Sequence, residues 1–307
     1  MAADKNLRLK IIGRLSLFAT TLIWGSSFVI LKNVLDSVPT LYILAIRFTG
    51  ATIITALIGM KELRKMDLGY LKNGVLMGVF LFVAYALQTF GLAHTTPGKN
   101  AFLTSTYAVI VPFLGWAIYK KKPDIYNVAA GFMAIAGIGL VSLSSNLNMG
   151  LGEGLTTLCG LFYAVHILAT SHAVRERSVM LLNTIQFAVT AVLSWFFALI
   201  TEPFPVNMPV DAYLSIAYLC VMCTAVCYFL QTLGQKYTPP ATAAIILTLE
   251  SVFGTAISVA FYGEKLNARL VLGFLLIFLA VLVSETKLSF LWEKLRKKSD
   301  EKNYSLQ

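Results

Sequence analysis

The chain has 307 residues, of which 57% are hydrophobic and only 13% are charged, and its formal net charge is +10. Soluble domains usually carry charge on about a quarter of their residues, so this composition excludes an ordinary globular protein. It also argues against nucleic acid as a partner, which +10 would suggest in a soluble chain.

Continuous apolar runs predict an all-α integral membrane protein. A helix needs about 20 apolar residues to cross a hydrocarbon core of about 30 Å. A strand-built barrel is excluded because the runs do not alternate. The first run follows basic residues, as in a signal peptide, but its counterpart later in the chain indicates a retained helix. In chain order the ten predicted helices cover 13–34, 40–60, 69–92, 98–119, 125–144, 152–172, 180–200, 211–235, 240–262 and 268–288.

Lys and Arg are divided unequally between the two sides of this topology. With the N-terminus in the cytoplasm, 20 of the 25 lie in cytoplasmic tails and loops and four in outer loops, while Arg47 lies within a span. The bias predicts that both termini are cytoplasmic in a multi-pass plasma-membrane protein, most simply of a bacterial cytoplasmic membrane. Residues 289–307 form a basic cytoplasmic tail, expected to anchor the last helix or to contact anionic lipid.

The chain contains an internal repeat. Val83 to Gly91 matches Val226 to Gly234 at an offset of 143, and Ile46-Arg47-Phe48 matches Ile185-Gln186-Phe187 at an offset of 139. A four-residue insertion in the loop after the seventh helix reconciles the two offsets. The predicted repeats are 1–148 and 149–288. Because each holds five helices, an odd number, the second must be inverted relative to the first.

Several motifs in these repeats resemble the EamA-type branch of the drug/metabolite transporter superfamily. They are Trp24-Gly25-Ser26-Ser27-Phe28, Thr95-Thr96-Pro97, Thr238-Pro239-Pro240, Leu249-Glu250-Ser251-Val252-Phe253 and Gly263-Glu264-Lys265-Leu266. The resemblance implies a ten-helix transporter whose cavity is lined by helices 1, 3, 4, 6, 8 and 9 and which moves amino acids or related metabolites, often outward. One departure is that Tyr119-Lys120-Lys121-Lys122 stands where the second half has Tyr262-Gly263-Glu264-Lys265, so the Gly-Glu corner occurs once.

Glu250 is the strongest candidate site residue. It lies eleven residues past Pro239, or about 16 Å into the membrane by helical rise. Its repeat counterpart, Tyr107, reaches nearly the same depth from the other face, so the pair is predicted to form the floor of one site. Glu250 could bind a substrate ammonium or carry a coupling proton, and the alternative is a structural carboxylate bonded to a neighbouring helix.

Further polar and aromatic candidates lie on the predicted cavity helices. Arg47 could neutralise a substrate carboxylate or snorkel to the interface, and His166 could relay protons or serve in packing. Helix packing is also the alternative explanation for the glutamines and for the polar stripe of the fourth helix. The remaining predicted substrate-binding residues are Trp24, Ser27, Tyr85, Gln88, Asn100, Thr104, Tyr228 and Gln231.

The function predicted from these features is secondary active transport of a small polar or amphipathic metabolite by alternating access, with an amino acid or derivative as substrate and export as direction. Cys220, Cys223 and Cys227 share a helix side, but the pattern favours buried thiols, so no metal and no cofactor are expected. No catalytic constellation indicates an enzyme. A multidrug exporter of lipophilic cations is the main alternative, with a membrane-embedded enzyme or a channel as minor ones. The expected partners are the small-molecule substrate and membrane lipid, with the protein a monomer or homodimer.

Overall fold

The computed structural model describes residues 2–287 apart from 121, 123–124 and 143–148. The predicted repeat boundary at 148 and the predicted tail 289–307 lie outside the described residues. The elements of the described part are α1 (Ala2–Val34), α2 (Thr40–Ile58), η1 (Leu63–Lys65), α3 (Leu68–Ala93), α4 (Pro97–Thr104), α5 (Tyr107–Tyr119), α6 (Ile125–Ser142), α7 (Leu151–Ala173), α8 (Val179–Thr201), α9 (Val210–Cys220), η2 (Val221–Val226), α10 (Cys227–Tyr237), α11 (Pro240–Ile257), η3 (Ser258–Tyr262) and α12 (Ala268–Thr286).

Ten apolar helical segments account for the described part of the chain. Eight of them are long and apolar enough to cross a membrane, and three of these are built from several elements joined end to end: Pro97–Ile118, Val210–Tyr237 and Thr242–Tyr262. Two shorter apolar helices, Ile125–Val141 and Ala268–Val283, complete the set. The predicted ten-helix, all-α membrane fold is therefore confirmed.

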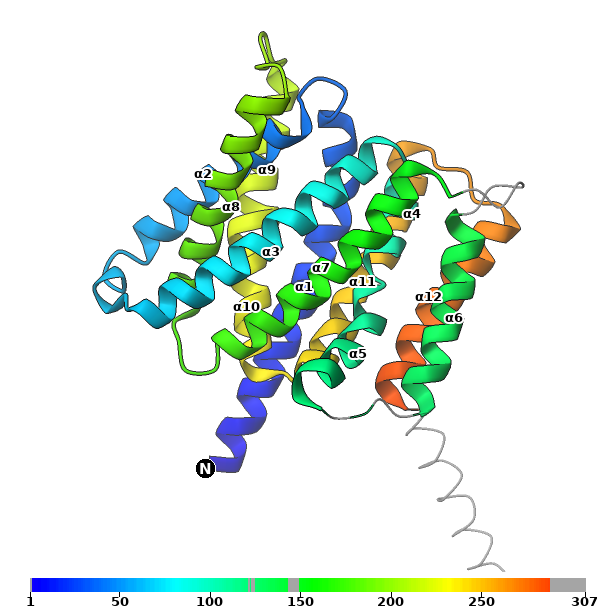
Figure 1. The fold of residues 1–307 in the computed structure, drawn as a ribbon, viewed down its shortest axis with the longest axis horizontal. Coiled ribbons are helices and arrows are strands. Elements are labelled where there is room, and N and C mark those ends of the chain that lie inside the picture. Colours follow the sequence, from blue (N-terminus) through cyan, green and yellow to red (C-terminus); the bar gives the residue numbers. More distant parts are fainter. Residues whose placement is uncertain (1, 121, 123–124, 143–148, 288–307) are drawn as a thin grey trace, which may run out of the picture.

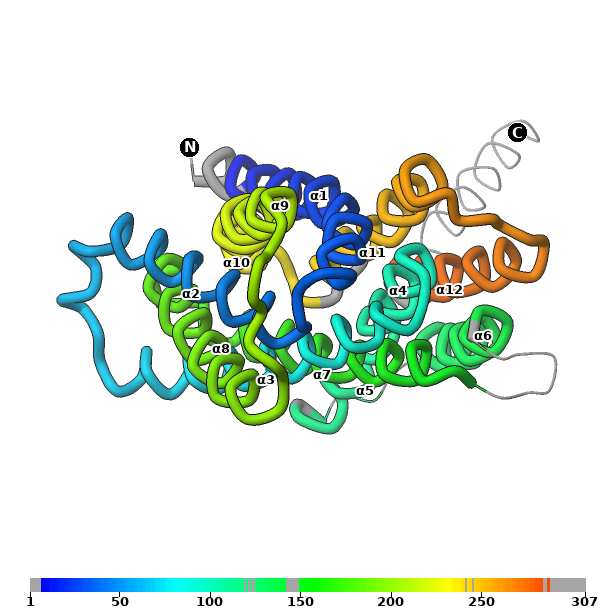
Figure 2. Tube along the Cα trace, turned by 90° about the horizontal axis from the view of Figure 1, so that it is seen from above, coloured from blue at the N-terminus to red at the C-terminus, as the bar shows by residue number. Residues whose placement is uncertain are grey.

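Helices of the two halves pack in matching ways. α2 packs on α8 and α6 on α12, so that each of these helices contacts its own counterpart, at opposite edges of the bundle (Figures 1 and 2). α3 packs on α7 as α10 packs on α1, and α4 and α5 pack on α7 as α11 packs on α1. Exchanging the halves leaves this set of contacts unchanged, which is what a two-fold relation between repeats requires.

The counterpart helices α4 and α11 begin at opposite ends of α1. Close to the start of α4, Lys32 at the end of α1 donates hydrogen bonds to the carbonyls of Leu92 and Ala93 at 2.8 and 3.0 Å. By contrast, a side chain added at Gly13, near the start of α1, would lie 3.0 Å from the Thr238 hydroxyl, which comes just before α11. The second repeat is therefore inverted relative to the first.

Side-chain caps begin several helices where the sequence places Asp, Ser, Thr or Asn. The Asp67 carboxylate accepts from the N–H of Tyr70 at 2.7 Å to begin α3, and Thr96 caps α4 with Pro97 as its first residue. This arrangement is favourable because proline lacks the N–H that a first helical turn cannot bond. α11 begins differently, since Pro239 is its N-cap and Pro240 its first residue, with Thr238 one position before the cap.

Two of the membrane-crossing segments are distorted midway. The fourth is broken at Ser105 and Thr106, where the N–H of Thr106 bonds to the carbonyl of Leu103, three residues back. The break comes just before Tyr107, whereas Pro112 lies inside α5. The eighth contains the π-helical turn η2 between α9 and α10.

Small residues allow close helix contacts. A Cβ added at Gly74 would lie 2.4 Å from Ile185 Cγ2, and one at Gly78 would lie 2.6 Å from Val189 Cβ. The Gly74/Gly78 pair therefore serves the contact between α3 and α8, as small residues commonly do in membrane helices.

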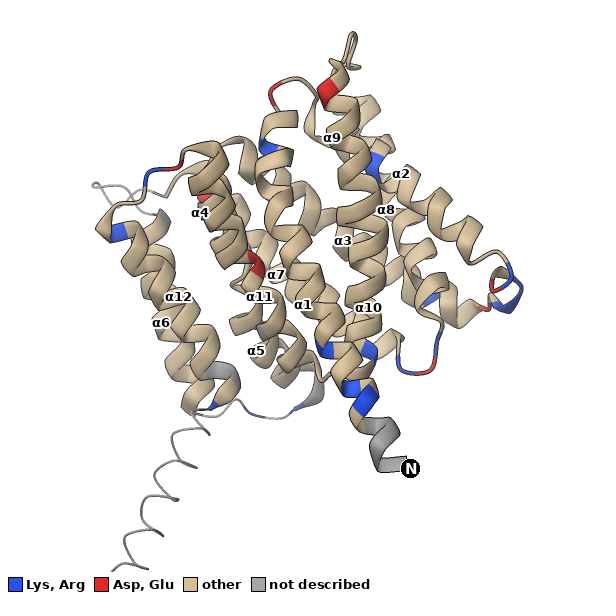
Figure 3. Ribbon diagram, turned by 180° about the vertical axis from the view of Figure 1, so that it is seen from behind, with Lys and Arg blue, Asp and Glu red and all other residues tan. Residues whose placement is uncertain are grey.

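Charge is largely absent from the middle of the bundle (Figure 3). Lys and Arg gather towards the end that carries the N-terminus and in the connecting loops, while large apolar side chains such as Phe132 and Leu199 are 71% and 65% exposed. Such a surface suits contact with lipid. Two charged side chains are buried in mid-helix, Arg47 at 1% and Glu250 at 5% exposure. Which end faces the cytoplasm stays a prediction.

Candidate functional site

A cavity in the centre of the bundle brings together most of the predicted site residues. In this conformation the cavity is small, with a volume of about 30 Å³. Ten predicted residues line it, and Asn100 and His166 do not. The lining residues are Trp24, Ser27, Phe28, Leu31, Arg47, Tyr85, Gln88, Thr104, Tyr107, Tyr163, Ile167, Tyr228, Gln231, Leu247 and Glu250.

The cavity lies on the axis that relates the two halves. A residue can contact its own repeat counterpart only near that axis. The rings of Tyr85 and Tyr228 lie 6.2 Å apart between centroids, and those of Phe48 and Phe187 lie 5.8 Å apart. Both pairs are counterparts, and so are Tyr107 and Glu250, which lie 143 positions apart.

Glu250 and Tyr107 are joined directly. The Tyr107 hydroxyl donates to Glu250 Oε1 at 3.1 Å, with both side chains buried. Glu250 reaches this place from the middle of α11, whereas Tyr107 is the first residue of α5, directly after the break in its segment. The second carboxylate oxygen, Oε2, has no hydrogen-bond partner among the described residues, so it can accept a proton or a ligand N–H.

Arg47 contributes a positive charge to the same cavity. Its Nε donates to the Thr224 hydroxyl, and its Nη2 donates to the Tyr85 hydroxyl and to the Cys223 carbonyl, both at 3.2 Å. The guanidinium carbon also lies 4.8 Å from the centroid of the Tyr85 ring, within the range of a cation–π interaction. Arg47 therefore does not snorkel to the interface, and its Nη1 has no hydrogen-bond partner among the described residues.

Arg47 and Glu250 do not pair with each other. Within the described part of the chain the one ion pair joins Lys99 and Glu153, at 3.0 Å and near the start of α4. Two opposite charges that are both buried and both satisfied by neutral groups are unusual, because a buried charge is costly unless it is paired. The cavity thus offers an unpaired cation and a carboxyl group with one free oxygen to whatever enters it.

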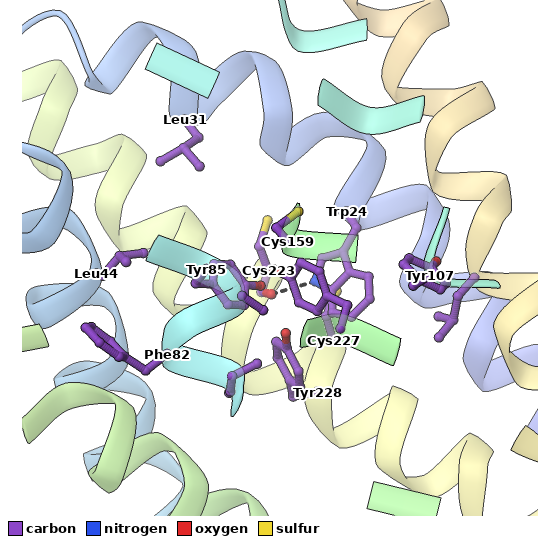
Figure 4. Close-up of a cluster of buried hydrophobic side chains, with 14 of the residues drawn as sticks. Trp24, Leu31, Leu44, Phe82, Tyr85, Tyr107, Cys159, Cys223, Cys227 and Tyr228 are labelled. Carbon is purple, nitrogen blue, oxygen red and sulfur yellow. Dashed lines mark hydrogen bonds between the residues drawn. The ribbon is translucent and has the colours of Figure 1, made fainter. Parts of the chain in front are cut away.

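Aromatic rings form much of the cavity wall (Figure 4). Trp24 lies 5.2 Å from Tyr228 between ring centroids, and Tyr163 lies 5.7 Å from Tyr85 and 6.4 Å from Tyr107. At these spacings the rings contact one another, so a ligand larger than a few atoms has to part them. We did not predict Tyr163, although its pairing with Trp24 at the offset of 139 is a signal that could have identified it.

A layer of amides lies at and behind this wall. Gln88 accepts from the Tyr163 hydroxyl at 2.8 Å and donates to Thr104 at 3.1 Å. Asn100 donates to the Gln88 carbonyl and to Thr156, at 3.1 and 2.7 Å, so it supports the cavity wall without reaching the cavity. Its predicted contact with substrate is not supported by this position.

His166 also lies behind the wall. Its Nε2 is 2.8 Å from Gln186 Oε1, and its ring packs against Tyr228 at 6.0 Å between centroids. The histidine therefore belongs to a packed polar contact between α7 and α8, and a relay role would require Tyr228 to move.

The four cysteines are free and buried. No group of three or more His, Cys, Asp or Glu side chains among the described residues is arranged to hold a metal ion.

These features define a class of protein: a ten-helix membrane protein of two inverted repeats, with a charged and aromatic cavity where the repeats meet. Inverted repeats around a midplane cavity are typical of secondary transporters. The sequence profile of the EamA-like transporter family matches residues 11–143 and again 150–286. The chain belongs to that family and is a membrane transporter.

Proteins similar to this chain are also named as transporters. An uncharacterized transporter of Archaeoglobus fulgidus is 34% identical over 275 residues, covering 88% of this chain and 84% of the relative. The uncharacterized transporter YetK of Bacillus subtilis is 27% identical over 134 residues, covering 42% of this chain and 40% of the relative. A solved crystal structure shares the fold with a TM-score of 0.68 at 16% identity, covering 90% of this chain and 98% of that one.

Proposed function

We propose that this protein is a secondary transporter that moves a small amphipathic zwitterion, such as an amino acid or a derivative, by alternating access. The observation that carries the proposal is the pair of buried, mutually unpaired charges of Arg47 and Glu250 on one cavity. A substrate carboxylate can bind at the free Nη1 of Arg47 and a substrate ammonium at the free Oε2 of Glu250. Each charge then obtains the partner that burial demands.

The aromatic wall favours an apolar substituent between these two groups. Tyr107, Tyr163 and Tyr228 offer ring faces and hydroxyl groups, a combination that accommodates ligands with both apolar and polar parts. Export as the direction and the bacterial cytoplasmic membrane as the location are parts of the proposal that rest on the resemblance and on the charge bias.

Proton coupling through Glu250 completes the proposed mechanism. A carboxyl group on the two-fold axis lies equally far from both ends of the bundle. It can therefore exchange a proton with either side of the membrane as the cavity opens to each in turn. Substrate ammonium and proton then compete for the same oxygen atoms, which links release of one to uptake of the other.

The multidrug-exporter alternative has some support from the same cavity. Glu250 surrounded by aromatic rings would suit a lipophilic cation. Arg47 opposes it, because a second positive charge in a cavity of low dielectric repels such a substrate unless the substrate also carries a carboxylate.

The decisive experiment combines ligand screening with transport. Purified protein is tested for thermal stabilisation by L-amino acids, by their decarboxylated amines and by their deaminated acids, since a ligand that binds the folded state raises its stability. We expect stabilisation by compounds that carry both charges. Stabilisation by the amines alone would support the cation exporter instead, and no response from any set would contradict the zwitterion proposal.

Transport in proteoliposomes then tests the coupling. A pH gradient should drive flux of the stabilising amino acid in wild type and not in Glu250→Gln, while the exposed Glu176→Gln serves as a matched control with full coupling. Coupling retained in Glu250→Gln would remove Glu250 as the proton carrier.

A further inference from the structure

The π-helical turn in the eighth segment occurs in one repeat only. Tyr70 and Tyr85 match Tyr213 and Tyr228 at the same offset of 143, so α3 and the α9–η2–α10 segment contain equal numbers of residues between these points. Nevertheless α3 is an uninterrupted α-helix, whereas residues Val221–Val226 form a π-helix. Single π-turns inside α-helices occur frequently at functional sites.

The π-turn releases one backbone carbonyl from the helix. The N–H of Cys227 bonds to the carbonyls of Met222 and Thr224 and passes over that of Cys223, which an α-helix would have used. The Cys223 carbonyl instead accepts from Trp24 Nε1 at 2.8 Å and from Arg47 Nη2 at 3.2 Å.

The same turn orients the neighbouring hydroxyl. Thr224 Oγ1 donates to the carbonyl of Leu219, five residues back, at 2.8 Å, which directs its lone pairs towards Arg47 Nε. Both Thr224 and Arg47 are buried, at 0% and 1% exposure. Two acceptors from one turn therefore hold two of the three guanidinium nitrogens.

The first repeat has no equivalent of this arrangement. The counterpart of Arg47 is Gln186, which bonds to Asn183 and His166, and the counterparts of Cys223 and Thr224 are Phe80 and Leu81. The positive charge and the turn that holds it are thus both confined to one side of the two-fold axis.

We propose that Thr224, together with the Cys223 carbonyl, is a positioning residue that fixes the guanidinium of Arg47 so that Nη1 faces the cavity and recognises the carboxylate of the substrate. The part of the proposal that concerns recognition of a substrate carboxylate rests on the zwitterion transport proposed above. The part that concerns the immobilisation of Arg47 does not depend on any substrate.

The first test measures Arg47 itself. In protein labelled with ¹⁵N-arginine, the Nε–H resonance of Arg47 is assigned by its loss in Arg47→Lys. Thr224→Val should accelerate hydrogen exchange at this group roughly tenfold or more, since a bond to a charged group contributes that factor. Thr224→Ser, which keeps the hydroxyl, should restore slow exchange.

Thr89→Val is the matched control. Thr89 is equally buried, and its hydroxyl has no hydrogen-bond partner among the described residues, so its replacement should leave the Arg47 exchange rate unchanged. If Thr224→Val does not fold, Thr224→Ala is used instead, since it removes the same hydrogen bond to Arg47 Nε with a smaller side chain. Wild-type exchange in either variant overturns the positioning role.

The second test measures selectivity. For the L-amino acid that most stabilises the wild type, Thr224→Val should reduce the preference over its decarboxylated amine roughly tenfold, with Thr89→Val unchanged. An undiminished preference overturns carboxylate recognition by the held guanidinium. If no amino acid stabilises the wild type, the transport proposal fails, while the exchange measurement still decides whether Thr224 positions Arg47.

Discussion

Glu264 joins the second repeat to the start of α4. Its carboxylate accepts hydrogen bonds from the Thr96 hydroxyl, from the N–H of Gly98 at 2.9 Å and from the Ser258 hydroxyl. The side chain is 9% exposed. At the opposite end of the bundle the Thr238 hydroxyl, before α11, has no hydrogen-bond partner among the described residues. The sequence counterpart of Gly263-Glu264 there is Lys120-Lys121.

Replacement of Glu264 by alanine should therefore loosen one end of the cavity more than the other. Each net hydrogen bond to a charged group contributes about 1.5–3 kcal/mol, and burial of the carboxylate offsets part of the sum. The negative charge at the start of α4 adds about 0.3–1 kcal/mol through the helix dipole. We expect a loss of about 2 kcal/mol at this joint, which shifts the ratio of closed to separated arrangements roughly 30-fold.

Distance measurement between spin labels provides the assay. Nitroxides at the exposed positions His94 and Lys265, in a background lacking the native cysteines, report the gap between the start of α4 and the loop that carries Glu264. Wild type in nanodiscs should give a single short distance, and Glu264→Ala should add a longer one. Glu202→Ala is the control, because Glu202 accepts from the N–H of Leu41 at 2.8 Å in the separate contact between α8 and α2. An unchanged distance distribution in Glu264→Ala would refute the reasoning.

Three further predictions follow from particular residues. Single cysteines at Lys99 and Lys236 should react with an impermeant reagent from opposite sides of the membrane, and same-side labelling would contradict the inverted topology. Partial burial raises the pKa of Glu202 above its ordinary value near 4.5, so its contribution to stability is present at lower pH and is lost as pH rises through the raised value. Glu202→Gln should therefore flatten the fall of unfolding temperature between about pH 4 and 7, and an equally steep fall would refute this. Gly25→Ala should lower stability by about 1–3 kcal/mol, as overpacking does, because the added Cβ would lie 2.6 Å from Phe253 Cβ; an unchanged unfolding temperature would show that the helices yield.

The sequence predicts well how deep a site residue lies in the membrane. It predicts less well whether the side chain of that residue reaches the cavity. Helical rise places Glu250 and Tyr107 at a common depth, and the structure joins them by a hydrogen bond. Asn100 and Thr104 lie one turn apart on α4 and both contact Gln88, yet only Thr104 reaches the cavity. The difference is a single turn of about 5.4 Å along the helix, and no periodicity argument could show where the cavity ends.

Local distortions are the second reason why prediction falls short. The break at Ser105 and Thr106 and the π-turn at Val221–Val226 change the direction in which every following residue points. Neither carries a proline or glycine signal within it, and Pro112, which does, lies in a continuous helix. The contacts of Arg47 with Thr224 and with the Cys223 carbonyl depend on the π-turn, so they could not be derived from spacing.

The candidate site lies where the two repeats pack symmetrically but differ in their charged residues. Near the axis the aromatic counterparts remain alike, which keeps the packing of the two halves equivalent. The charged and titratable residues each face a neutral counterpart, so their positions are not duplicated. The alike pairs are Tyr85 with Tyr228 and Phe48 with Phe187, and the unlike pairs are Tyr107 with Glu250, Arg47 with Gln186 and Ser27 with His166. Glu250 contacts its own counterpart Tyr107 and so lies at the axis, where one carboxylate would serve both arrangements under the proposed mechanism, whereas the guanidinium of Arg47 lies to one side of the axis.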